Sequence, residues 1–433
     1  MDKKIVLICI EENTSKVAKE LSPPFGLLVA ASVLRSAGRY VEIYHIVDGP
    51  DLERNLADMC SNAFIVGFTT MTTSNLKAVV KASRIVSGLG IFVYWGGAHA
   101  TLLPEISLNE PSVNAVLRGE AEANLLGLVK WREGKVDPES VPGLCFKRED
   151  GSLCIQDLPK IVHESELSCH AFDLLDMSVY LGREEYHFGD CSSGLTRVLP
   201  YMTSKGCHKN CAFCYNSVVN RGKWRGYGLD NVFREMDWLR DTLNLEGWYF
   251  YDDNFFTDQD RAWAVLERYS MPSFVELDLH RVDASFLERA RACNVERLYI
   301  GAESGNDVML RRIRKGITAD EIRFVADLCS KYNVDVEFSF MMLFPGETPE
   351  QLRDTFNLVS DLRTYKNVRI DGPKVYNPYP GTSLYRELLE SGWKAPQTNE
   401  EWSAYVRDIS PRDTGVFLTE KHFKVLSDNG IVF

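Results

Sequence analysis

Short apolar segments alternate with longer amphipathic segments along the N-terminal third of the chain. Residues 5–10 form an apolar run that two glutamates end, and residues 24–38 follow with one apolar helical face and a closing glycine. Further strand-like runs lie at 40–46, 64–68, 91–95 and 115–117, and a second helix-like segment lies at 75–88. Short apolar strands that alternate with helices predict an N-terminal doubly wound, Rossmann-like parallel sheet.

Small, hydroxyl-bearing and glycine residues follow the ends of these strands, in segments 11–22, 69–74, 96–99 and 119–122. Ligands of doubly wound sheets bind beyond the carboxyl ends of the strands. A glycine after a strand is also ordinary turn geometry, so each segment alone is weak evidence, whereas the four together predict a ligand site. The candidate binding residues are Thr69, Thr70, Gly96, Gly97, His99, Gly119 and Glu120.

The alternation of strands and helices returns from Arg197 onward. Six strand-like segments, each followed by polar residues, lie at 198–203, 247–251, 274–279, 297–300, 334–343 and 368–376. Six βα units predict a partial (β/α)6 TIM-like barrel, whose chemistry belongs at the carboxyl ends of its strands. The complete prediction is an α/β chain with the N-terminal sheet domain at 1–135, a linker with a small hairpin (143–155) at 136–195, the barrel at 196–390 and a short C-terminal segment at 391–433.

The composition of the chain indicates which partners to expect and in which cellular compartment the protein acts. The chain has 433 residues, a formal net charge of −12 and no long basic run, which argues against a nucleic-acid partner. Its longest apolar run, residues 25–34, is too short to span a bilayer, so we expect no membrane partner. We expect a cytoplasmic protein, because many free cysteines fit a reducing compartment.

Three cysteines follow the first predicted barrel strand in a C-x3-C-x2-C spacing: Cys207, Cys211 and Cys214. Three thiolates in so short a loop can bind one soft metal centre and leave a fourth coordination position open. A structural zinc ion is the main alternative, but it requires four ligands, and His208 within the short loop is an awkward fourth. The spacing therefore favours an iron–sulfur cluster with one open iron over zinc or unrelated thiols.

This loop, with Phe213 before its last cysteine, resembles the cluster loop of radical S-adenosylmethionine (SAM) enzymes, specifically those with an N-terminal cobalamin-binding-like domain. The resemblance covers roughly residues 1–390. Further segments are similar to family motifs at 23–27, 96–99, 250–257, 299–305, 314–318 and 344–348. The cysteine loop is highly specific in combination with these segments, none of which is specific alone.

The resemblance implies a 4Fe–4S cluster on the three cysteines, with SAM on the open iron. Reductive cleavage of SAM would then give a 5′-deoxyadenosyl radical that abstracts hydrogen from a small-molecule substrate. It further implies an electron donor of the flavodoxin or ferredoxin type and allows a downstream reductase. The implied site residues are Glu303 and Ser304 for SAM, Arg281 for a carboxylate, Tyr215 for adenine, and Asp252 and Asp253 as candidate catalytic residues, each with a structural role at the barrel rim as its alternative.

Cobalamin is a candidate cofactor that the resemblance leaves open. The chain lacks the Asp-x-His-x-x-Gly signature that supplies a histidine to cobalt, and His45 does not have that spacing, so we expect His45 to be an ordinary strand or loop histidine. Ala121 also replaces a glycine of the family's Gly-Glu-Gly-Glu turn. The segment after the barrel is also shorter than the C-terminal domain that methylating relatives often carry.

The leading hypothesis is cobalamin-dependent methylation of a small secondary metabolite. The alternative is a cobalamin-independent radical dehydration or redox rearrangement of a sugar, similar to the diol-dehydratase branch of aminoglycoside pathways. A cobalamin or iron–sulfur sensor without catalysis is a third hypothesis. A methylthiotransferase is disfavoured because it would carry a second cysteine set, whereas Cys9, Cys60, Cys145 and Cys154 are scattered and expected to be core or surface residues.

Overall fold

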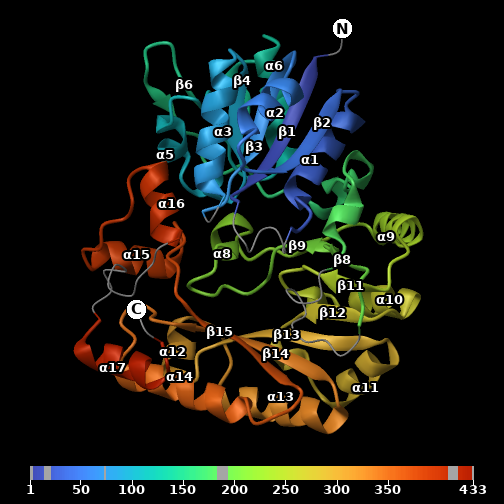
Figure 1. Cartoon of the computed structure of the whole chain (residues 1–433), viewed down its shortest axis with the longest axis vertical. Helices are drawn as coiled ribbons and strands as arrows, with labels where there is room; N and C mark the ends of the chain where they lie inside the picture. Colours follow the sequence, from blue (N-terminus) through green and yellow to red (C-terminus); the bar gives the residue numbers. More distant parts are fainter. Residues whose placement is uncertain (1–2, 14–20, 73–74, 183–193, 408–417, 432–433) are drawn as a thin grey trace. The chain divides into compact units, whose positions relative to one another are not determined.

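The computed structural model of the chain describes residues 3–13, 21–72, 75–182, 194–407 and 418–431. Parts of two predicted ligand-binding segments, 14–20 and 73–74, lie outside these residues. The chain divides into two compact units, drawn in Figure 1. The first unit comprises Met1–Gly194, Asp230–Trp238 and Pro396–Asp408, and the second comprises Leu195–Leu229, Leu239–Ala395 and Ile409–Phe433.

The first unit is built on a seven-stranded sheet with the order β2-β1-β3-β4-β5-β6-β7. Its strands are β1 (Lys4–Glu11), β2 (Val41–Val47), β3 (Ala63–Thr69), β4 (Phe92–Gly96), β5 (Ala115–Leu117), β6 (Leu144–Lys147) and β7 (Leu153–Cys154). β1 to β5 are parallel, and β1 is buried along all its inner positions because helices cover both faces of a doubly wound sheet. The chain order reverses at β1 and β3, which places the topological switch point, the usual ligand crevice, between these two strands.

Helices of the first unit connect these strands. They are α1 (Phe25–Ser36), α2 (Leu52–Met59), α3 (Leu76–Gly88), α4 (Ala98–Leu102), α5 (Pro104–Asn109) and α6 (Ala121–Arg132), joined by α16 (Asn399–Arg407) from near the C-terminus. α1 packs beside α6, whereas α3 packs beside α2 and α16. Because right-handed crossovers run in opposite directions from the switch point, these two groups of helices cover opposite faces.

The strands β6 and β7 form a hairpin that extends the first sheet. β6 pairs antiparallel with β5, and β7 pairs antiparallel with β6. The short 3-10 turn η2 (Pro138–Ser140) precedes the hairpin, and the turns η3 (Glu164–Glu166), η4 (Phe172–Leu174) and η5 (Met177–Tyr180) follow it.

The second unit holds a six-stranded parallel sheet with the order β15-β14-β13-β12-β11-β8. Its strands are β8 (Val198–Tyr201), β11 (Gly247–Phe250), β12 (Ser273–Glu276), β13 (Val295–Glu303), β14 (Asp335–Met342) and β15 (Val368–Val375). Between β8 and β11 in the sequence, β9 (Ser204–Lys205) and β10 (Arg225–Gly226) form a separate two-stranded sheet. The strands follow one another in chain order, as in a TIM-like barrel opened between its first and last strands. The predicted fold class, a doubly wound sheet followed by a partial (β/α)6 barrel, is therefore confirmed.

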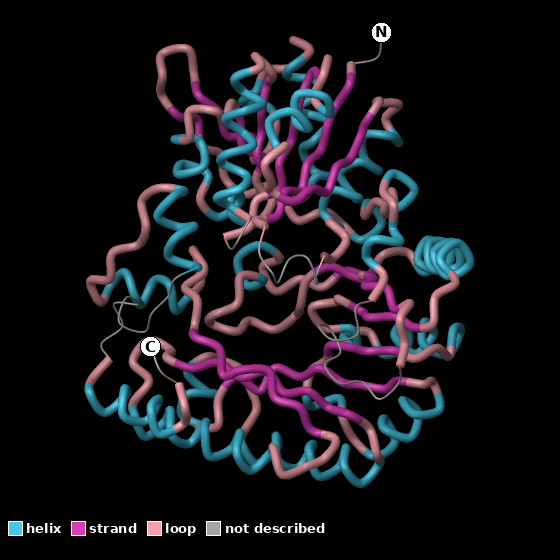
Figure 2. Tube along the Cα trace, viewed as in Figure 1, coloured by secondary structure: helices cyan, strands magenta, loops and turns pink. Residues whose placement is uncertain are grey.

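Helices cover one face of this second sheet, as the cyan and magenta traces of Figure 2 show. The helices of this part of the chain are α9 (Leu229–Leu243, shared between the units), α10 (Gln259–Tyr269), α11 (Ala284–Ala292), α12 (Asp307–Arg312), α13 (Ala319–Tyr332), α14 (Pro349–Leu362) and α15 (Ser383–Glu390). The short helix α8 (Asn216–Val219) and the turns η6 (Phe255–Thr257) and η7 (Leu279–Arg281) lie in the loops between strands and helices. Along β14, alternate residues from Val336 to Met342 are buried, and those between them are partly exposed. This period of two leaves the inner face of the sheet available to polar side chains.

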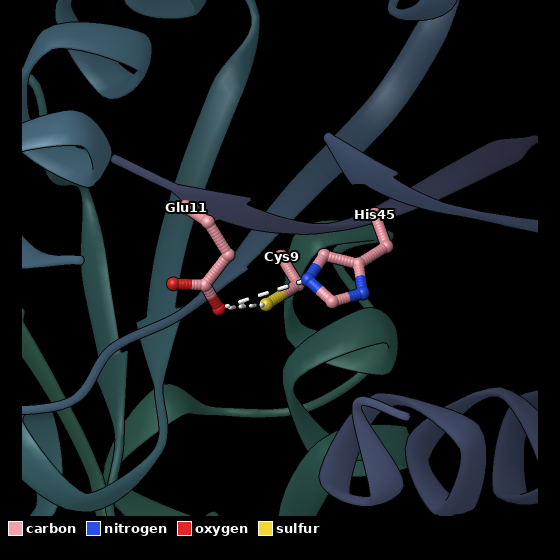
Figure 3. A group of neighbouring side chains, drawn as sticks. All are labelled: Cys9, Glu11 and His45. Carbon is pink, nitrogen blue, oxygen red and sulfur yellow. Dashed lines mark hydrogen bonds and ion pairs between the residues drawn. The ribbon is translucent and has the colours of Figure 1, made fainter. Parts of the chain in front are cut away.

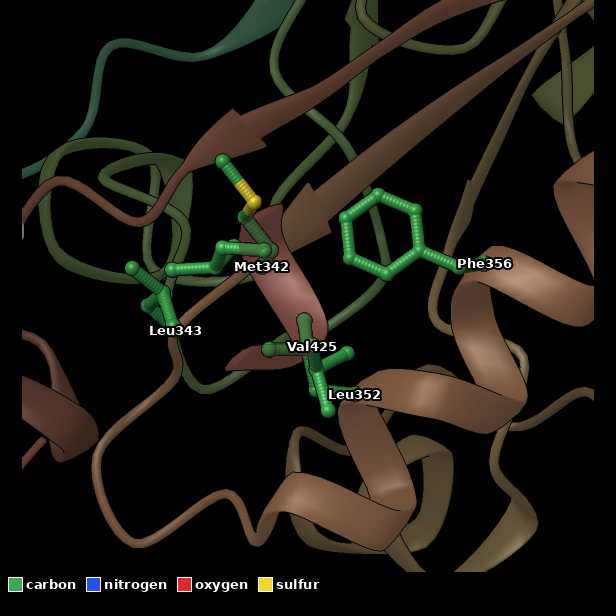
Figure 4. Packing of buried hydrophobic residues seen from close by; sticks show 6 residues of the cluster. Met342, Leu343, Leu352, Phe356 and Val425 are labelled. Atoms are coloured by element: carbon green, nitrogen blue, oxygen red, sulfur yellow. The ribbon is translucent and has the colours of Figure 1, made fainter. Parts of the chain in front are cut away.

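A last helix, α17 (Glu420–Asp428), closes an apolar cluster of the second unit. Val425 and Leu426 pack with Met342, Leu343, Leu352 and Phe356, and Figure 4 shows this packing. The buried His422 donates a hydrogen bond from Nε2 to the carbonyl oxygen of Glu347 over 2.9 Å. None of the helices in the described residues is long and apolar enough to cross a membrane.

Replacing Leu426 by alanine should lower the free energy of unfolding of the second unit by about 2–4 kcal/mol, because it leaves a cavity in this cluster. Lys424→Ala on the exposed side of the same helix is the matched control, expected to change stability by less than about 0.5 kcal/mol. Denaturant unfolding of the two variants checks this. Equal stabilities would mean that α17 does not cover the core.

Candidate active site

A cavity of about 230 Å³ lies at the carboxyl ends of the strands of the second unit. It contains all three cysteines of the C-x3-C-x2-C loop together with several charged side chains. Its lining residues include Cys207, Lys209, Cys211, Cys214, Asn216, Asp253, Glu276, Asp278, Tyr299, Glu303 and Lys315. Parallel α/β sheets bind ligands at this edge, so the cavity is the candidate active site.

The cysteine loop runs from β9 to α8 and is fixed by backbone hydrogen bonds. The N–H of Ala212 donates to the carbonyl oxygen of Ile313 over 2.9 Å, and the N–H of Leu384 donates to the carbonyl oxygen of Ala212 over 3.1 Å. Gly206, just before Cys207, has φ +82°, and a Cβ there would lie 2.2 Å from the carbonyl oxygen of Lys223. The loop therefore needs glycine at this position.

Asp252 holds the chain that leads into this loop. It is fully buried and accepts hydrogen bonds from the backbone N–H of Thr203 (3.0 Å), from the Thr203 hydroxyl (2.7 Å) and from the Ser204 hydroxyl. Asp252 is not among the residues that line the cavity. Its contacts favour a positioning role over direct contact with a ligand.

Asp253 holds the other side of the loop and also faces the cavity. Its carboxylate accepts from the N–H of Gly206 over 3.0 Å and from the Asn216 side-chain amide over 2.6 Å. Gly206 precedes the first cysteine, and Asn216 follows the last. The two adjacent aspartates thus brace the cysteine loop from both ends, and Asp253 alone of the pair can reach a bound molecule.

Burial raises the pKa of the thiols of Cys207, Cys211 and Cys214, that of Cys214 to about 12. Without a metal these sulfur atoms would hold their protons, whereas a bound iron centre stabilises the thiolate form. No fourth cysteine belongs to the described lining of the cavity. Three soft ligands beside an open cavity therefore fit a 4Fe–4S cluster with one open iron.

Glu303 and Lys315 form an ion pair in the same cavity, with 2.9 Å between Oε1 and Nζ. Glu303 is the last residue of β13, and its φ of +67° turns the chain sharply there. Burial alone would lower the pKa of Lys315, but Glu303 and Cys211 raise it overall, so the ammonium stays charged. The pair presents one anion and one cation to a ligand. The sequence predicted a role for Glu303 and none for Lys315.

Glu276 is a cavity residue that sequence analysis missed. Burial and then the negative charges of Asp253 and Asp252 raise its pKa to about 8, so the carboxyl is protonated at neutral pH. The sequence predicted a strand as far as residue 279, which made Glu276 an interior strand residue. In the structure β12 ends at Glu276, which brings this acid to the sheet edge.

The structure places three predicted ligand-binding residues outside the cavity lining. Ser304 is fully buried, and its hydroxyl lies 3.2 Å from that of Thr355 on α14. Tyr215 packs its ring 5.9 Å from that of Tyr379. Arg281 ends the turn η7, whose first residue, Leu279, does line the cavity.

In the first unit, the predicted binding residues after β3 and β4 lie together. The Thr70 hydroxyl donates to the carbonyl oxygen of Gly96 over 2.7 Å and accepts from the N–H of Ala100 over 3.1 Å. At Gly97, φ is +91°, and a Cβ would lie 2.6 Å from the carbonyl oxygen of Thr70 and 3.0 Å from the Thr69 hydroxyl. These residues form a tight backbone edge beside the switch point.

His99 is engaged on both ring nitrogens. Nδ1 lies 3.2 Å from the Thr72 hydroxyl, and Nε2 donates to Oδ1 of Asn399 over 3.0 Å. Burial lowers the pKa of His99 to about 4, so the ring is neutral. This side chain supports the loop and offers no open nitrogen to a ligand.

The predicted pair Gly119 and Glu120 follows β5. The N–H of Gly119 donates to the Thr101 hydroxyl over 3.1 Å, and Oε2 of Glu120 accepts from the N–H of Val162 over 3.1 Å. These contacts tie the end of β5 to α4 and to the segment that follows the hairpin.

Comparison with known proteins identifies the second unit. Residues 201–359 match the family model of the Radical SAM superfamily, a range that contains the cysteine loop, Glu276, Glu303 and Lys315. This family implies a 4Fe–4S cluster and SAM as cofactors, which agrees with the ligand set of the cavity.

Two curated relatives extend the likeness over most of the chain. An uncharacterized methyltransferase of Pyrococcus horikoshii is 28% identical over 414 residues, which cover 90% of this chain and 85% of the relative. The anaerobic magnesium-protoporphyrin IX monomethyl ester cyclase of Synechocystis sp. is 25% identical over 346 residues, 74% of this chain and 64% of the relative.

Among solved structures, the fold is similar to that of TsrM from Kitasatospora setae, a radical SAM methyltransferase bound to tryptophan and a SAM analogue. The TM-score is 0.69 at 17% identity, and the match covers 90% of this chain and 76% of TsrM. Another structure of TsrM holds cobalamin and a 4Fe–4S cluster. Fold, cysteine loop and family match agree: residues 201–359 form a Radical SAM domain, and the fold of the whole chain is similar to that of radical SAM methyltransferases.

Proposed function

We propose that this enzyme methylates a small-molecule substrate, with cobalamin bound by the first unit and SAM bound by the second. The observation that carries the proposal is the joint placement of three cysteines and the Glu303–Lys315 ion pair in one cavity of a Radical SAM domain. The methyltransferase names of the Pyrococcus relative and of TsrM support methyl transfer as the reaction.

In this proposal Cys207, Cys211 and Cys214 hold the cluster through their thiolates. Once held there, a cluster would supply the electron for reductive cleavage of SAM, with a flavodoxin- or ferredoxin-type protein as its electron source. Lys315 and Glu303 carry opposite charges, which match the carboxylate and ammonium of the methionine part of SAM. Asp252 and Asp253 act as positioning residues, because they fix the loop that carries the three thiolates.

Glu276 is the proposed proton carrier of the cavity. A carboxyl with a pKa near 8 can give up or take a proton close to neutral pH, which suits general acid–base work. Asp253 lies in the same lining, and its negative charge helps to keep this proton on Glu276.

Cobalamin is proposed for the switch-point edge of the first sheet. Thr69, Thr70, Gly96 and Gly97 form this edge, where doubly wound sheets bind their ligands. Because both nitrogens of His99 are engaged, the proposal gives His99 no role as a cobalt ligand.

A radical SAM reaction without cobalamin is the second candidate. Two observations favour it: the sequence lacks the histidine signature, and the Synechocystis relative is a cyclase and not a methyltransferase. In that case the first unit would serve as a scaffold, and a downstream reductase would complete the conversion of the product.

Replacing Cys207, Cys211 and Cys214 together by alanine should remove the iron and abolish SAM cleavage, because the cluster loses all its protein ligands. Iron content, visible absorbance and 5′-deoxyadenosine release measure this. The control is Cys329→Ala, a buried cysteine of α13 outside the cavity lining, which should keep iron and activity. SAM cleavage by the triple variant would contradict the proposed site.

The chain purified without oxygen in the presence of hydroxocobalamin should contain close to one cobalt per chain. Gly96→Val should reduce this content at least about tenfold, because a side chain would enter the space beyond β4, where a Cβ meets nothing closer than 4.0 Å. Gly88→Ala, at the open end of α3, is the control with unchanged cobalt. Absence of cobalt from the unaltered chain would favour the second candidate.

Glu276→Gln should stabilise the protein increasingly as the pH rises. A carboxyl with a raised pKa in the folded state stabilises the fold at low pH and loses this contribution between its unfolded and folded pKa, here between about pH 5 and pH 8. The melting temperature of the variant should therefore exceed that of the unaltered chain by a margin that grows to roughly 5 °C or more by pH 8.5. Glu288→Gln, at an exposed position of α11, should show a constant difference. A constant difference for both variants would refute the raised pKa of Glu276.

A further inference from the structure

The parallel pairing of β1 and β2 aligns three metal-binding side chains far from the cysteine loop in sequence. Cys9 on β1 lies directly opposite His45 on β2. Glu11 follows two residues after Cys9, and residues two apart in a strand share one face of the sheet. Figure 3 shows the three side chains converging on one point.

The spacing of the three donor atoms suits a single metal ion. Sγ of Cys9 lies 3.5 Å from Oε1 of Glu11, and Nε2 of His45 lies 3.6 Å from the same oxygen. All three atoms lie within 4.8 Å of one another. Zinc bonds of about 2.0–2.3 Å at tetrahedral angles place neighbouring donor atoms roughly 3.3–3.8 Å apart, so two of the three separations already match.

His45 is oriented as a metal ligand would be. Its Nδ1 lies 2.9 Å from the hydroxyl of Tyr180, and the two rings stack at 5.7 Å. An Nδ1–H that donates to Tyr180 leaves the lone pair on Nε2, the nitrogen that faces Glu11. The His45 side chain is only 5% exposed, and Nε2 has no hydrogen-bond partner among the described residues. A buried lone pair without a donor is costly, and a cation would satisfy it.

The chemistry of Cys9 and Glu11 also favours binding of a cation. The Cys9 thiol donates a hydrogen bond to Oε1 of Glu11. A divalent ion would release that proton to solvent, form the S–metal bond and neutralise both the thiolate and the carboxylate.

We propose that Cys9, Glu11 and His45 bind one zinc-type divalent ion, with the fourth tetrahedral position left to water or another ligand. One soft sulfur, one imidazole and one carboxylate are a zinc ligand set, whereas magnesium and calcium prefer oxygen alone. The ion joins β1 to β2, the edge strand of the described sheet. His45, expected from the sequence to be an ordinary strand histidine, acquires a specific role, and the proposal does not depend on the reaction catalysed by the second unit.

The test uses the full chain with its cluster reconstituted, stripped with a mild chelator and titrated with Zn²⁺ alone. We expect one zinc per chain in addition to iron. Cys9→Ser and His45→Ala should each lower zinc affinity by more than about 100-fold without loss of iron, and Tyr180→Phe by about 10–100-fold, the usual cost of losing a residue that orients a ligand. Cys60→Ser, another buried cysteine of the first unit, is the control with unchanged zinc and iron.

A reciprocal experiment separates this site from the cysteine loop. The chain with Cys207, Cys211 and Cys214 all replaced by alanine should lose iron and still bind one zinc. Titrated with Co²⁺, the same chain should show thiolate-to-cobalt absorption that disappears when Cys9 is also replaced. Failure of the unaltered chain to bind zinc would overturn the proposal. Zinc affinity of the Cys9→Ser and His45→Ala variants equal to that of the unaltered chain would also overturn it, as would the absence of the cobalt–thiolate absorption.

Discussion

Two adjacent carboxylates, the buried Asp252 and the more exposed Asp253, hold the cysteine loop in place, and the candidate chemistry depends on them. Asp252 accepts hydrogen bonds from the backbone N–H and the hydroxyl of Thr203, before the loop. Asp253 accepts hydrogen bonds from Gly206 and Asn216, at the two ends of the loop. The Asp252 carboxylate is buried away from water and would be costly without donors, so the donors of Thr203 and Ser204 cannot leave it without a large penalty. The end of β11 and the cysteine loop therefore behave as one rigid piece. Burial, and then the negative charges of Asp253 and Asp252, raise the pKa of Glu276, so the two residues that support the loop also affect the protonation of a carboxyl in the cavity.

The strands and the cysteine loop could be predicted from sequence because their signals are local. Apolar runs between polar turns gave β1 and β14 to within a residue or two, and the cysteine spacing needs no tertiary information. Glu276 was missed because an acid inside an apolar run gives no sign of where the strand stops. The different roles of Asp252 and Asp253 could not be predicted from the sequence either. Neighbouring residues at a strand end point in opposite directions, and only the hydrogen-bond partners of each carboxylate show which of the two faces the cavity.

Strand register carries information that no local pattern contains. Cys9 and His45 lie 36 positions apart in the sequence, and neither belongs to a recognisable metal motif. Their opposition follows from a single pairing of β1 with β2, and a shift by one residue would turn the cysteine and the histidine to opposite faces. The expectation that His45 is an ordinary histidine was reasonable from its flanking residues alone. Lys315 illustrates the same limit, because only the fold brings it to the end of β13 beside Glu303.

The first unit is completed by helix α16, which lies near the end of the sequence. Asn399 on this helix bonds His99 and the carbonyl oxygen of Ile106, and Glu400 pairs with Arg84 on α3. During synthesis the first sheet leaves the ribosome long before these residues do, and the whole barrel sequence emerges between the two events. Because α16 belongs to the first unit and α17 to the second, neither unit is a continuous stretch of chain. Co-translational folding of the first unit therefore ends only when translation is almost finished, and a nascent chain halted at the end of the barrel would expose the partly finished surface of α3 to chaperones.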